Sequence, residues 1–425
     1  MTLPVTPEVL AELAGTRPSP AGTATLRAAL HARRLLLLKS LLVRVEQHSA
    51  ALPATARERF EHHWSLLEQA ERADPAAVRE VLDYPTTGAW LAEAIGAPDG
   101  PAFEHRLAHT GAVAVAAAVR AGCRFEAALA LPSGVLALPG LGTLRCPSGR
   151  VRLSGRAGLV RMAERPGGPG VVLLRARGPA ARTVGGGPGW SAVRPLPGGR
   201  AVLDDLDPYR VPGRGIGPDA LAPAGRQEVS HRLWAQRWRE ARALLRTTDP
   251  DRATEVTALL FALVPLASPG PAGGTTVSAT LRSAPGAVLT QFPSDAGDLA
   301  ESLVHETHHT KLTVLNDLLP LCRQNGGTRH RVGWRPDPRP VLGVLQGAYA
   351  HLALTDLWRR ARNEPAAPAV WRHRAGGRFE KYREQVGEAL SALLGSDELT
   401  HAGREFVREM GRRHESLGTP AGNLS

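Results

Sequence analysis

Cysteine, lysine and aromatic residues are scarce in this chain of 425 residues. Its three cysteines, Cys123, Cys146 and Cys322, are too few and too scattered for a disulfide framework or a thiolate metal site, so we expect free thiols in a reducing compartment. No window approaches the ~20 apolar residues of a membrane span, and the N-terminus lacks the pattern of a signal peptide. The sequence therefore predicts a soluble, cytoplasmic protein with no membrane partner.

Because lysine is nearly absent, the formal net charge of +12 comes almost entirely from arginine. The arginines are spread along the chain, with no run of five or six and no interleaved aromatic residues, which is not the pattern of a nucleic-acid-binding surface. We therefore expect a solvated basic surface and no nucleic-acid partner. Such a surface would favour an acidic partner.

The pattern of apolar residues, glycine and proline divides the chain into three parts. Residues 1–122 have the apolar period of helices, residues 123–215 have short apolar runs broken by glycine and proline, and residues 216–425 are again mainly helical. These parts are predicted as a helical N-terminal region, a β-rich middle segment and a C-terminal domain. The expected fold class is α+β.

Some helices have recognisable boundary signals. A helix over residues 23–49 has Thr23 or Thr25 as its candidate N-cap, and a helix over residues 101–122 closes at its final glycine. The apolar pattern also predicts one helix over residues 251–267.

Two short strands are predicted over residues 275–281 and 286–292, joined by a turn that contains a Pro-Gly pair. Residues 178–190, rich in glycine, are predicted to be a flexible connection without a nucleotide role. A helix follows the second strand directly, with Ser294 or Asp295 as its N-cap.

That helix carries the motif H-E-x-x-H as His305, Glu306 and His309. Residues four apart on a helix point the same way, so the two imidazoles can bind one ion. Glu306 lies about 100° round the axis, beside the ion rather than on it. Leucines at positions 299, 303 and 312 share or flank the histidine face and would shield it from water. The sequence therefore predicts a metal site, with Glu306 as the catalytic residue.

Two histidines leave the coordination shell open, so a third ligand is needed. The glycine and third histidine of a metzincin extension are missing after His309. The next strong helix carries His351 on its apolar face, and Asp356 lies further along it. We expect the third ligand to be His351 or else Asp356, on a helix that packs antiparallel to the motif helix.

Between the two helices lies the segment WRPDPRP, in which Arg335 and Arg339 are held extended by prolines. A rigid guanidinium group is suited to bidentate capture of a carboxylate. From spacing alone, a surface turn with solvated arginines is the favoured interpretation of this segment.

Three segments together resemble a known family: LDDLDPYR (203–210), LAESLVHETHHTKLTVLNDLLPL (299–321) and WRPDPRPVLGVLQGAYAHLAL (334–354). They are similar to the H-E-x-x-H proteins encoded beside ribosomally synthesised peptide natural products, which are 2-oxoglutarate-dependent peptide β-hydroxylases. The resemblance covers most of the chain, and its motifs are concentrated in residues 200–360.

The resemblance implies a zincin-like catalytic domain that holds Fe(II), with 2-oxoglutarate and O2 as co-substrates. It implies β-hydroxylation of one residue in a precursor peptide, which would be the partner. His305 and His309 match the family's metal ligands, and His351 matches a recurrent histidine taken as the third. Arg339, with Arg335 behind it, is our candidate for binding the 2-oxoglutarate carboxylate.

Iron oxygenases of this kind normally use two histidines and one carboxylate, so three histidines would be a departure. One alternative function is a zinc metallopeptidase with Glu306 as general base. Another is a peptide-binding protein without catalysis. In any of these, the strand over residues 286–292 offers an edge that an extended peptide could join.

Other polar groups have structural explanations. His105 and His109 are four apart on a predicted helix, but the arginine between them would repel a cation, and we expect packing roles. The acidic cluster of Asp204, Asp205 and Asp207 is expected to form a turn or a helix cap.

Overall fold

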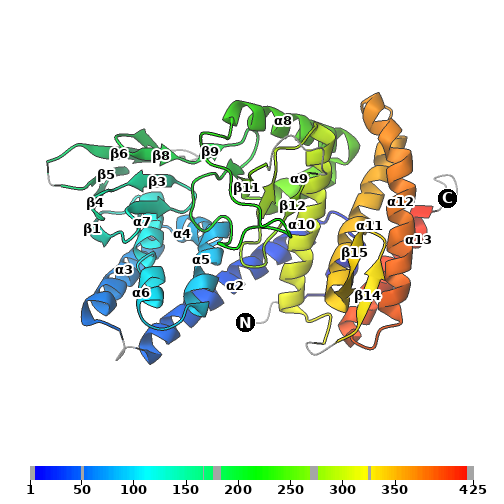
Figure 1. The fold of residues 1–425 in the computed structure, drawn as a ribbon, viewed down its shortest axis with the longest axis horizontal. Coiled ribbons are helices and arrows are strands. Elements are labelled where there is room, and N and C mark those ends of the chain that lie inside the picture. The colour runs from blue at the N-terminus through cyan, green and yellow to red at the C-terminus, as the bar shows by residue number, and fades with distance from the viewer. Residues whose placement is uncertain are drawn as a thin grey trace.

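The computed structural model describes residues 5–48, 52–165, 167–175, 183–268, 276–323 and 327–418. The chain has the mixed α+β architecture predicted from its sequence, with helical regions at both ends and strands between them. The molecule is elongated: the helices of residues 54–121 and the first sheet lie at one end, a second sheet lies in the middle, and the last helices lie at the other end (Figure 1).

The N-terminal region is helical, as predicted, and consists of α1 (Pro7–Ala14), α2 (Pro20–Gln47), α3 (Ala54–Ala73), α4 (Pro75–Leu82), α5 (Pro85–Gly96), α6 (Pro101–Leu107) and α7 (Thr110–Ala121). Five of these helices begin with proline, whose fixed φ suits the first helical position and whose missing N–H costs nothing there.

The N-cap predicted for α2 was wrong. Ser19, not Thr23 or Thr25, caps the helix, and its hydroxyl accepts a hydrogen bond of 3.0 Å from the backbone N–H of Gly22. The serine is followed by proline at the first helical position, which is a stronger start signal than either threonine.

The single helix predicted over residues 101–122 is two helices. α6 and α7 are separated at Ala108 and His109, where the backbone N–H of His109 bonds to the carbonyl of Arg106 in a tight turn. The predicted end is confirmed: Gly122 has a φ of 69° and closes α7 in the left-handed conformation that favours glycine.

The β-rich middle segment is confirmed. Its larger sheet has the order β1-β4-β5-β6-β7 and is antiparallel, and a smaller sheet has the order β2-β3-β8. Side chains in β4 alternate between buried and exposed, so one face of the larger sheet packs inward. The strands are β1 (Phe125–Ala130), β2 (Val135–Leu138), β3 (Gly142–Arg145), β4 (Arg150–Arg156), β5 (Leu159–Ala163), β6 (Gly170–Arg175), β7 (Thr183–Gly186) and β8 (Trp190–Ala192).

The flexible connection predicted over residues 178–190 was wrong where the structure describes it. Its described part contains β7 and begins β8, while residues 178–182 lie outside the described residues. Glycine at positions 185 and 187 approaches the backbone of β6 so closely that a side chain would not fit. Here glycine marks close strand contact rather than a loop.

A second five-stranded sheet occupies the middle of the molecule. Its order is β12-β13-β11-β10-β9; β10, β11 and β13 are parallel, and the two outer strands are antiparallel to their neighbours. The strands are β9 (Arg194–Pro195), β10 (Val202–Leu203), β11 (Ala262–Pro265), β12 (Ser278–Ala279) and β13 (Ala287–Thr290).

The helix predicted over residues 251–267 ends half-way. Only α9 (Pro250–Leu259) is helical, and β11 follows after two residues. All four residues of β11 are buried, because the strand is covered on both faces. Such a strand has a continuous apolar run that does not differ in pattern from a buried helix, which explains the wrong prediction.

The two strands predicted before the motif helix are present as β12 and β13, which pair as an antiparallel hairpin. The expectation that the second strand offers an edge to a peptide was wrong, because β13 pairs with β11 on one side and β12 on the other. Within the described residues, the edge strands of this sheet are β12 on this side and β9 on the other.

The C-terminal region is mainly helical, as predicted. A hairpin of β14 and β15 lies between α10 and α11 in the chain. It packs against α11 (Figure 1). The elements are α8 (His231–Thr248), α10 (Ala296–Leu318), β14 (Arg329–Val332), β15 (Arg335–Pro340), α11 (Val341–Asn363), α12 (Ala369–Leu394) and α13 (His401–Gly418).

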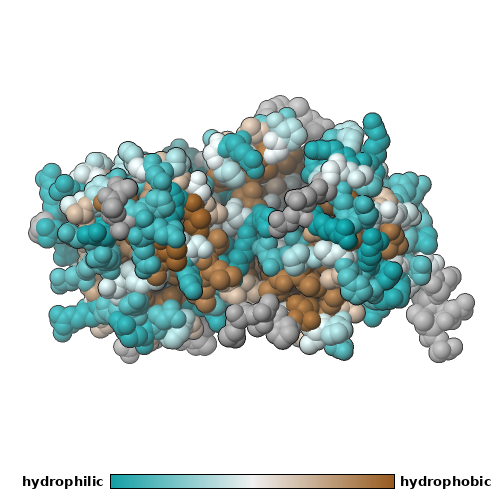
Figure 2. Space-filling view, turned by 90° about the horizontal axis from the view of Figure 1, so that it is seen from below, coloured by the Kyte–Doolittle hydropathy of each residue, from teal (hydrophilic) through white to brown (hydrophobic). Residues whose placement is uncertain are grey.

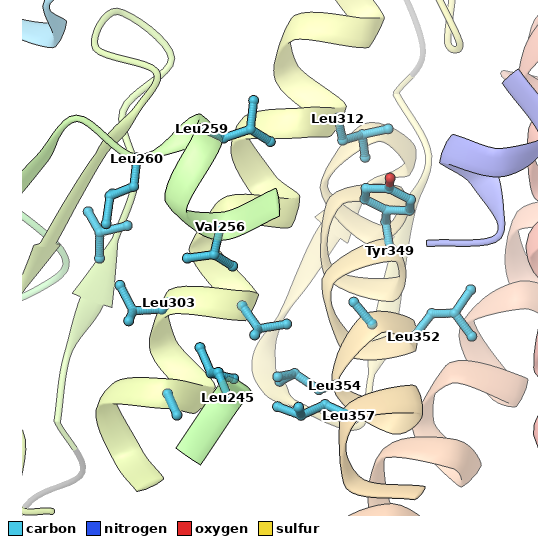
Figure 3. Packing of buried hydrophobic residues seen from close by; sticks show 14 of the residues in the cluster. Leu245, Val256, Leu259, Leu260, Leu303, Leu312, Tyr349, Leu352, Leu354 and Leu357 are labelled. Atoms are coloured by element: carbon cyan, nitrogen blue, oxygen red, sulfur yellow. The ribbon is translucent and has the colours of Figure 1, made fainter. Parts of the chain in front are cut away.

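Buried apolar residues form two large clusters. One lies among α8 to α13 and one face of the central sheet; in it, Leu354 and Leu357 point from α11 toward α10 (Figure 3). The other joins the N-terminal helices to the first two sheets. α2 contributes Leu30 to the former and Leu41 to the latter, so it links both ends of the molecule. The domain boundaries at residues 122 and 215 stay predictions.

The surface is largely hydrophilic on the face seen in Figure 2, as the content of 22% charged residues leads one to expect. Hydrophilic residues cover much of the face seen in Figure 2, with apolar residues gathered nearer its middle. In the described part of the chain, no helix combines the length and apolar character needed to cross a bilayer. The three cysteines are unpaired thiols, as predicted.

Candidate metal centre

The helix that carries H-E-x-x-H is α10, and its start is the predicted one. The carboxylate of Asp295 accepts a hydrogen bond of 2.9 Å from the backbone N–H of Asp298 and so caps the helix. The leucines at positions 299, 303 and 312 are fully buried, as expected for a face shielded from water. α10 packs against α11 in antiparallel fashion, since His309 contacts Gln346 and His305 contacts His351.

The two histidines of the motif point toward each other. Their Nε2 atoms lie 3.0 Å apart and their ring planes are at 88°. Two imidazole nitrogens on one ion, with bonds of about 2.1 Å, lie roughly 3.0–3.4 Å apart, so this spacing suits a shared ligand. Nδ1 of His309 lies 3.0 Å from Oε1 of Gln346; when it donates to this oxygen, Nε2 keeps its lone pair for a metal.

His351, the predicted third ligand, lies beside this pair. Its ring centroid is 5.2 Å from that of His305, and it is held between the rings of Trp334 and Tyr382 at 4.6 and 5.0 Å. Its Nδ1 is buried and has no hydrogen bond of full geometry to any described residue, although a backbone interaction with Gly347 raises the pKa of the ring. A buried imidazole nitrogen without a partner is unusual, and a bound ligand would satisfy it.

Burial keeps two of these histidines uncharged. It lowers the pKa of His305 well below its ordinary value, and the neighbouring His309 and His351 lower it further. Burial, followed by the proximity of His309, lowers the pKa of His351 to about 3. These two rings are therefore neutral near pH 7, which is the state in which imidazole binds a metal.

Glu306 lies on another side of α10, as its position in the motif predicted. Its side chain is almost completely buried, and one carboxylate oxygen accepts a hydrogen bond of 2.7 Å from the hydroxyl of Ser278 on β12. Burial raises the pKa of Glu306, while the nearby His309 opposes the rise. The carboxylate is thus fixed between the edge strand and the histidines.

The side chains do not yet form a complete coordination shell. As they stand, no group of three or more His, Cys, Asp or Glu side chains within the described residues is arranged to hold a metal ion. His305 and His309 are spaced for one ion, and the unpartnered nitrogen of His351 lies next to them. The residues therefore fit an ion that binds imidazole, such as Fe(II) or Zn(II), with the third position still to be closed.

Asp356, the alternative third ligand, is engaged elsewhere. Its carboxylate is 3.0 Å from Arg252 and 2.8 Å from Arg413, and Arg360 lies 3.5 Å away. These arginines lower its pKa despite its burial. Because three cations already share this carboxylate, His351 is the better candidate ligand.

Arg335 and Arg339 lie on β15, in the extended segment predicted for them. Both are partly exposed, and both pair with the carboxylate of Asp337, at 3.1 and 3.0 Å. Within the described residues, no hydrogen bond or ring contact joins either arginine to the histidine cluster. A role in binding a carboxylate stays a prediction for them.

Several residues around the cluster were not expected from sequence. Tyr382 on α12 donates a hydrogen bond to Glu301, and Arg378 lies 3.0 Å from the Tyr382 hydroxyl. Glu301 precedes His305 by four residues, so the helical period could have identified it as a neighbour of His305 on the same face of α10. Tyr382 and Arg378 lie far along the chain, and no local pattern marks them.

The chain was also compared with known proteins: it matches no protein-family model and no curated protein sequence. The resemblance to peptide β-hydroxylases therefore rests on the three quoted segments alone. It stays a hypothesis about function.

The other polar groups have the structural roles predicted for them. Asp204 accepts hydrogen bonds from the backbone N–H groups of Leu206 and Asp207, as in a turn. His109 packs against aromatic rings, and His105 is exposed on the other side of the break between α6 and α7.

Proposed function

We propose that this protein is an Fe(II)- and 2-oxoglutarate-dependent hydroxylase that modifies the β-carbon of a residue in a ribosomally synthesised peptide. The observation that carries the proposal is the pair of facing imidazoles, with Nε2 atoms 3.0 Å apart and a third buried histidine beside them. The resemblance of the quoted segments to such hydroxylases selects iron over zinc.

In this proposal His305, His309 and His351 hold the metal. When bound, ferrous iron with 2-oxoglutarate supplies the activation of O2 that hydroxylation needs. The chain's own part is to keep His305 and His351 neutral, to orient the three ligands and to exclude water. Gln346 orients His309, and Trp334 and Tyr382 enclose His351 on two sides.

Glu306 acts beside the metal rather than on it. Its hydrogen bond to Ser278 ties α10 to β12, so the carboxylate has a fixed position near His309. We propose that it orients the substrate or a water molecule at the site. An extended peptide would pair with the free edge of β12, which lies next to this carboxylate.

The test begins with metal content. Full-length protein loaded with Fe(II) without oxygen should hold about one iron per chain, and His305→Ala, His309→Ala and His351→Ala should each lower it at least ten-fold. His373→Ala, which changes an exposed histidine on α12, is the matched control. Unchanged iron content in the three variants would remove the basis of the proposal.

The second measurement is of product. The iron-loaded protein, its peptide and O2 should yield a peptide heavier by one oxygen atom only when 2-oxoglutarate is present. A peptide cut in two with zinc alone would instead identify a metallopeptidase. Peptide binding that survives the histidine substitutions, with no product from the natural protein, would identify a peptide-binding protein without catalysis.

The zinc metallopeptidase is the second candidate, and one observation favours it: Glu306 is buried beside His309 with a raised pKa, as a general base would be. Glu306→Gln separates the two functions. A peptidase should lose at least about 100-fold in rate, since it loses its base. A hydroxylase should keep a measurable fraction of its activity, because no base is needed at this position.

A further inference from the structure

The larger sheet, β1-β4-β5-β6-β7, leaves one of its faces to solvent, at the end of the molecule away from α12 and α13 (Figure 1). In β4 every second side chain is exposed, and Arg150, Arg152 and Arg156 are three of these four. The exposed face of an antiparallel sheet normally carries mixed polar side chains. Here it carries arginine and aliphatic side chains, and we call it the outer face.

The basic part of the outer face has no internal neutralisation. Within the described residues, the side chains of Arg150, Arg152 and Arg156 form no hydrogen bond or ion pair. Arg161 of β5 is exposed and bonds only to the carbonyl of Gly168, at 3.1 Å. The five strands of this sheet contain one carboxylate, that of Glu126. These guanidinium groups therefore keep their charge and most of their N–H donors for a partner.

The aliphatic part of the outer face adjoins the arginines on β5, β6 and β7. Four aliphatic side chains are each between 40% and 53% exposed there: Leu159, Val172, Leu174 and Val184. Leu174 lies opposite both Leu159 and Val184 in the sheet, and Val172 lies opposite Arg161. Side chains directly opposite on one face are in contact distance, so the four form a continuous patch that borders the basic part. Such an exposed apolar patch marks an interaction site.

The outer face is also hollowed over β1, β4 and β5. A cavity of about 370 Å³ is lined by Arg152 and Arg161, together with Glu126 and with His62 of α3. A hollow of this size is within the range that binds ligands in proteins. The basic part is thus concave, and a chain that lies in it can contact several arginines at once.

We infer that the outer face of the larger sheet binds an acidic polypeptide segment that carries aliphatic side chains next to its carboxylates. The arginines pair with the carboxylates, and the aliphatic residues of the segment are buried against the exposed leucines and valines. A single-stranded nucleic acid matches this face less well, because its bases stack on aromatic rings and the exposed side chains of these strands include none. The inference goes beyond the proposed function, since it concerns a face that includes none of the candidate metal ligands and needs no metal.

The experiment measures the binding of fluorescent peptides to the metal-free, full-length protein by fluorescence anisotropy. The main probe is about 10 residues long, more than enough to cross strands about 4.8 Å apart, and has an acidic block followed by a block of leucine and valine. Lysine replaces each acid in one comparison peptide, and serine replaces each aliphatic residue in another. The natural protein should bind the main probe at least ten-fold more tightly than either, and salt should weaken this binding.

Charge reversal tests the basic part. Arg152→Glu with Arg156→Glu should weaken binding of the main probe at least ten-fold, because two cations that attract the acidic block become anions. Arg232→Glu with Arg246→Glu is the matched control, at exposed positions of α8 and with the same change in net charge. This control variant should bind the main probe within about two-fold of the natural protein, since distant exposed charges are screened.

A second substitution tests the aliphatic part. Val172→Thr keeps the β-branched shape on the strand and should weaken binding of the main probe several-fold, but not binding of the serine-containing peptide. Val135→Thr, which changes an exposed valine on β2, is the control and should leave both affinities unchanged. Because all the substituted side chains are exposed, the midpoint of urea denaturation should be the same for every variant.

The inference is overturned by equal affinity for the three peptides, or by an equal loss of binding in the α8 control variant. Tighter binding of a single-stranded oligonucleotide, lost on Arg152→Glu with Arg156→Glu, would assign the outer face to nucleic acid instead. Self-association in sedimentation that the same variant abolishes would assign it to a second copy of the chain. None of these outcomes decides the proposed function, which is tested by iron content and product.

Discussion

At the scale of single residues, the candidate site depends on close packing around His351. Trp334 packs on its ring, and this position of the indole depends on Gly347 of α11. A Cβ on Gly347 would lie 2.6 Å from Cζ2 of Trp334, so even alanine would displace the indole. A glycine inside a helix normally reduces stability, and here its small size makes room for the ring.

Gly347→Ala should therefore reduce both stability and activity. The overpacking penalty of about 1–3 kcal/mol exceeds the gain of up to ~1 kcal/mol in helix propensity, so the free energy of unfolding should fall by about 1 kcal/mol. The proposed hydroxylation should fall about ten-fold or more, because His351 loses one of the rings that hold it. Urea denaturation and product formation measure the two effects.

Gly377→Ala on α12 is the control for this prediction. Gly377 is exposed, and nothing lies within 4 Å of the position that a Cβ would occupy. This substitution should raise the free energy of unfolding by about 0.5–1 kcal/mol. Equal effects of the two substitutions would show that Trp334 does not need Gly347.

At the scale of elements, α10 is held to α9 by a buried ion pair. The amino group of Lys311 is 2.7 Å from Oε1 of Glu255, and both side chains are almost completely buried. Burial lowers the pKa of Lys311, and the adjacent carboxylate opposes the shift. Lys311 lies on the motif helix, two residues after His309, so this contact helps to fix the helix that carries the candidate metal centre.

Lys311→Met should lower the free energy of unfolding by about 3–5 kcal/mol, because it leaves the Glu255 carboxylate buried without its partner. The double variant Lys311→Met, Glu255→Leu should recover at least half of this loss, since it removes both charges and keeps the volume apolar. Urea denaturation of the two variants tests the prediction. A double variant that is less stable than the single one would contradict it.

At the scale of the whole molecule, buried hydrogen bonds join the N-terminal helices to the segment that follows β10. The hydroxyl of Tyr84 donates to Asp204, and that of Thr86, on α5, donates to Asp207, each at 2.7 Å. Both carboxylates are buried. Burial, together with the nearby charge of Asp204, raises the pKa of Asp207 from 3.8 to about 7.

This shift predicts a pH dependence of stability. Between about pH 4 and pH 7 the folded protein binds a proton at Asp207 that the unfolded chain releases, so this group's contribution to the free energy of unfolding falls as the pH rises through that range. Asp207→Asn removes the contribution. Relative to the natural protein, the variant should therefore gain on the order of 2–4 kcal/mol between pH 4 and pH 7.

Urea denaturation at a series of pH values tests this prediction, because carboxylates that do not interact with Asp207 contribute equally to both proteins and cancel, which leaves in the difference the effect of Asp207 and its neighbour Asp204. Parallel stability curves for the natural protein and Asp207→Asn would contradict it. From about one pH unit above 7 the difference should be constant, because the carboxyl is then ionised in both the folded and the unfolded protein.

The sequence by itself determined what depends on neighbours along the chain. The helical period put His305 and His309 on one face of a helix, Asp295 identified where that helix begins, and Gly122 identified where another ends. Such features are encoded within a few residues, because a helix relates positions three and four apart and a cap is a local hydrogen bond. The mixed α+β class follows from the same local patterns.

Only the tertiary structure decided what depends on contacts between distant segments. Burial on both faces made residues 262–265 a strand rather than the end of a helix. Three arginines from separate elements engage Asp356, and α12 brings Tyr382 to His351. These residues have ordinary local patterns, and their roles arise from the packing of elements that are far apart in the chain.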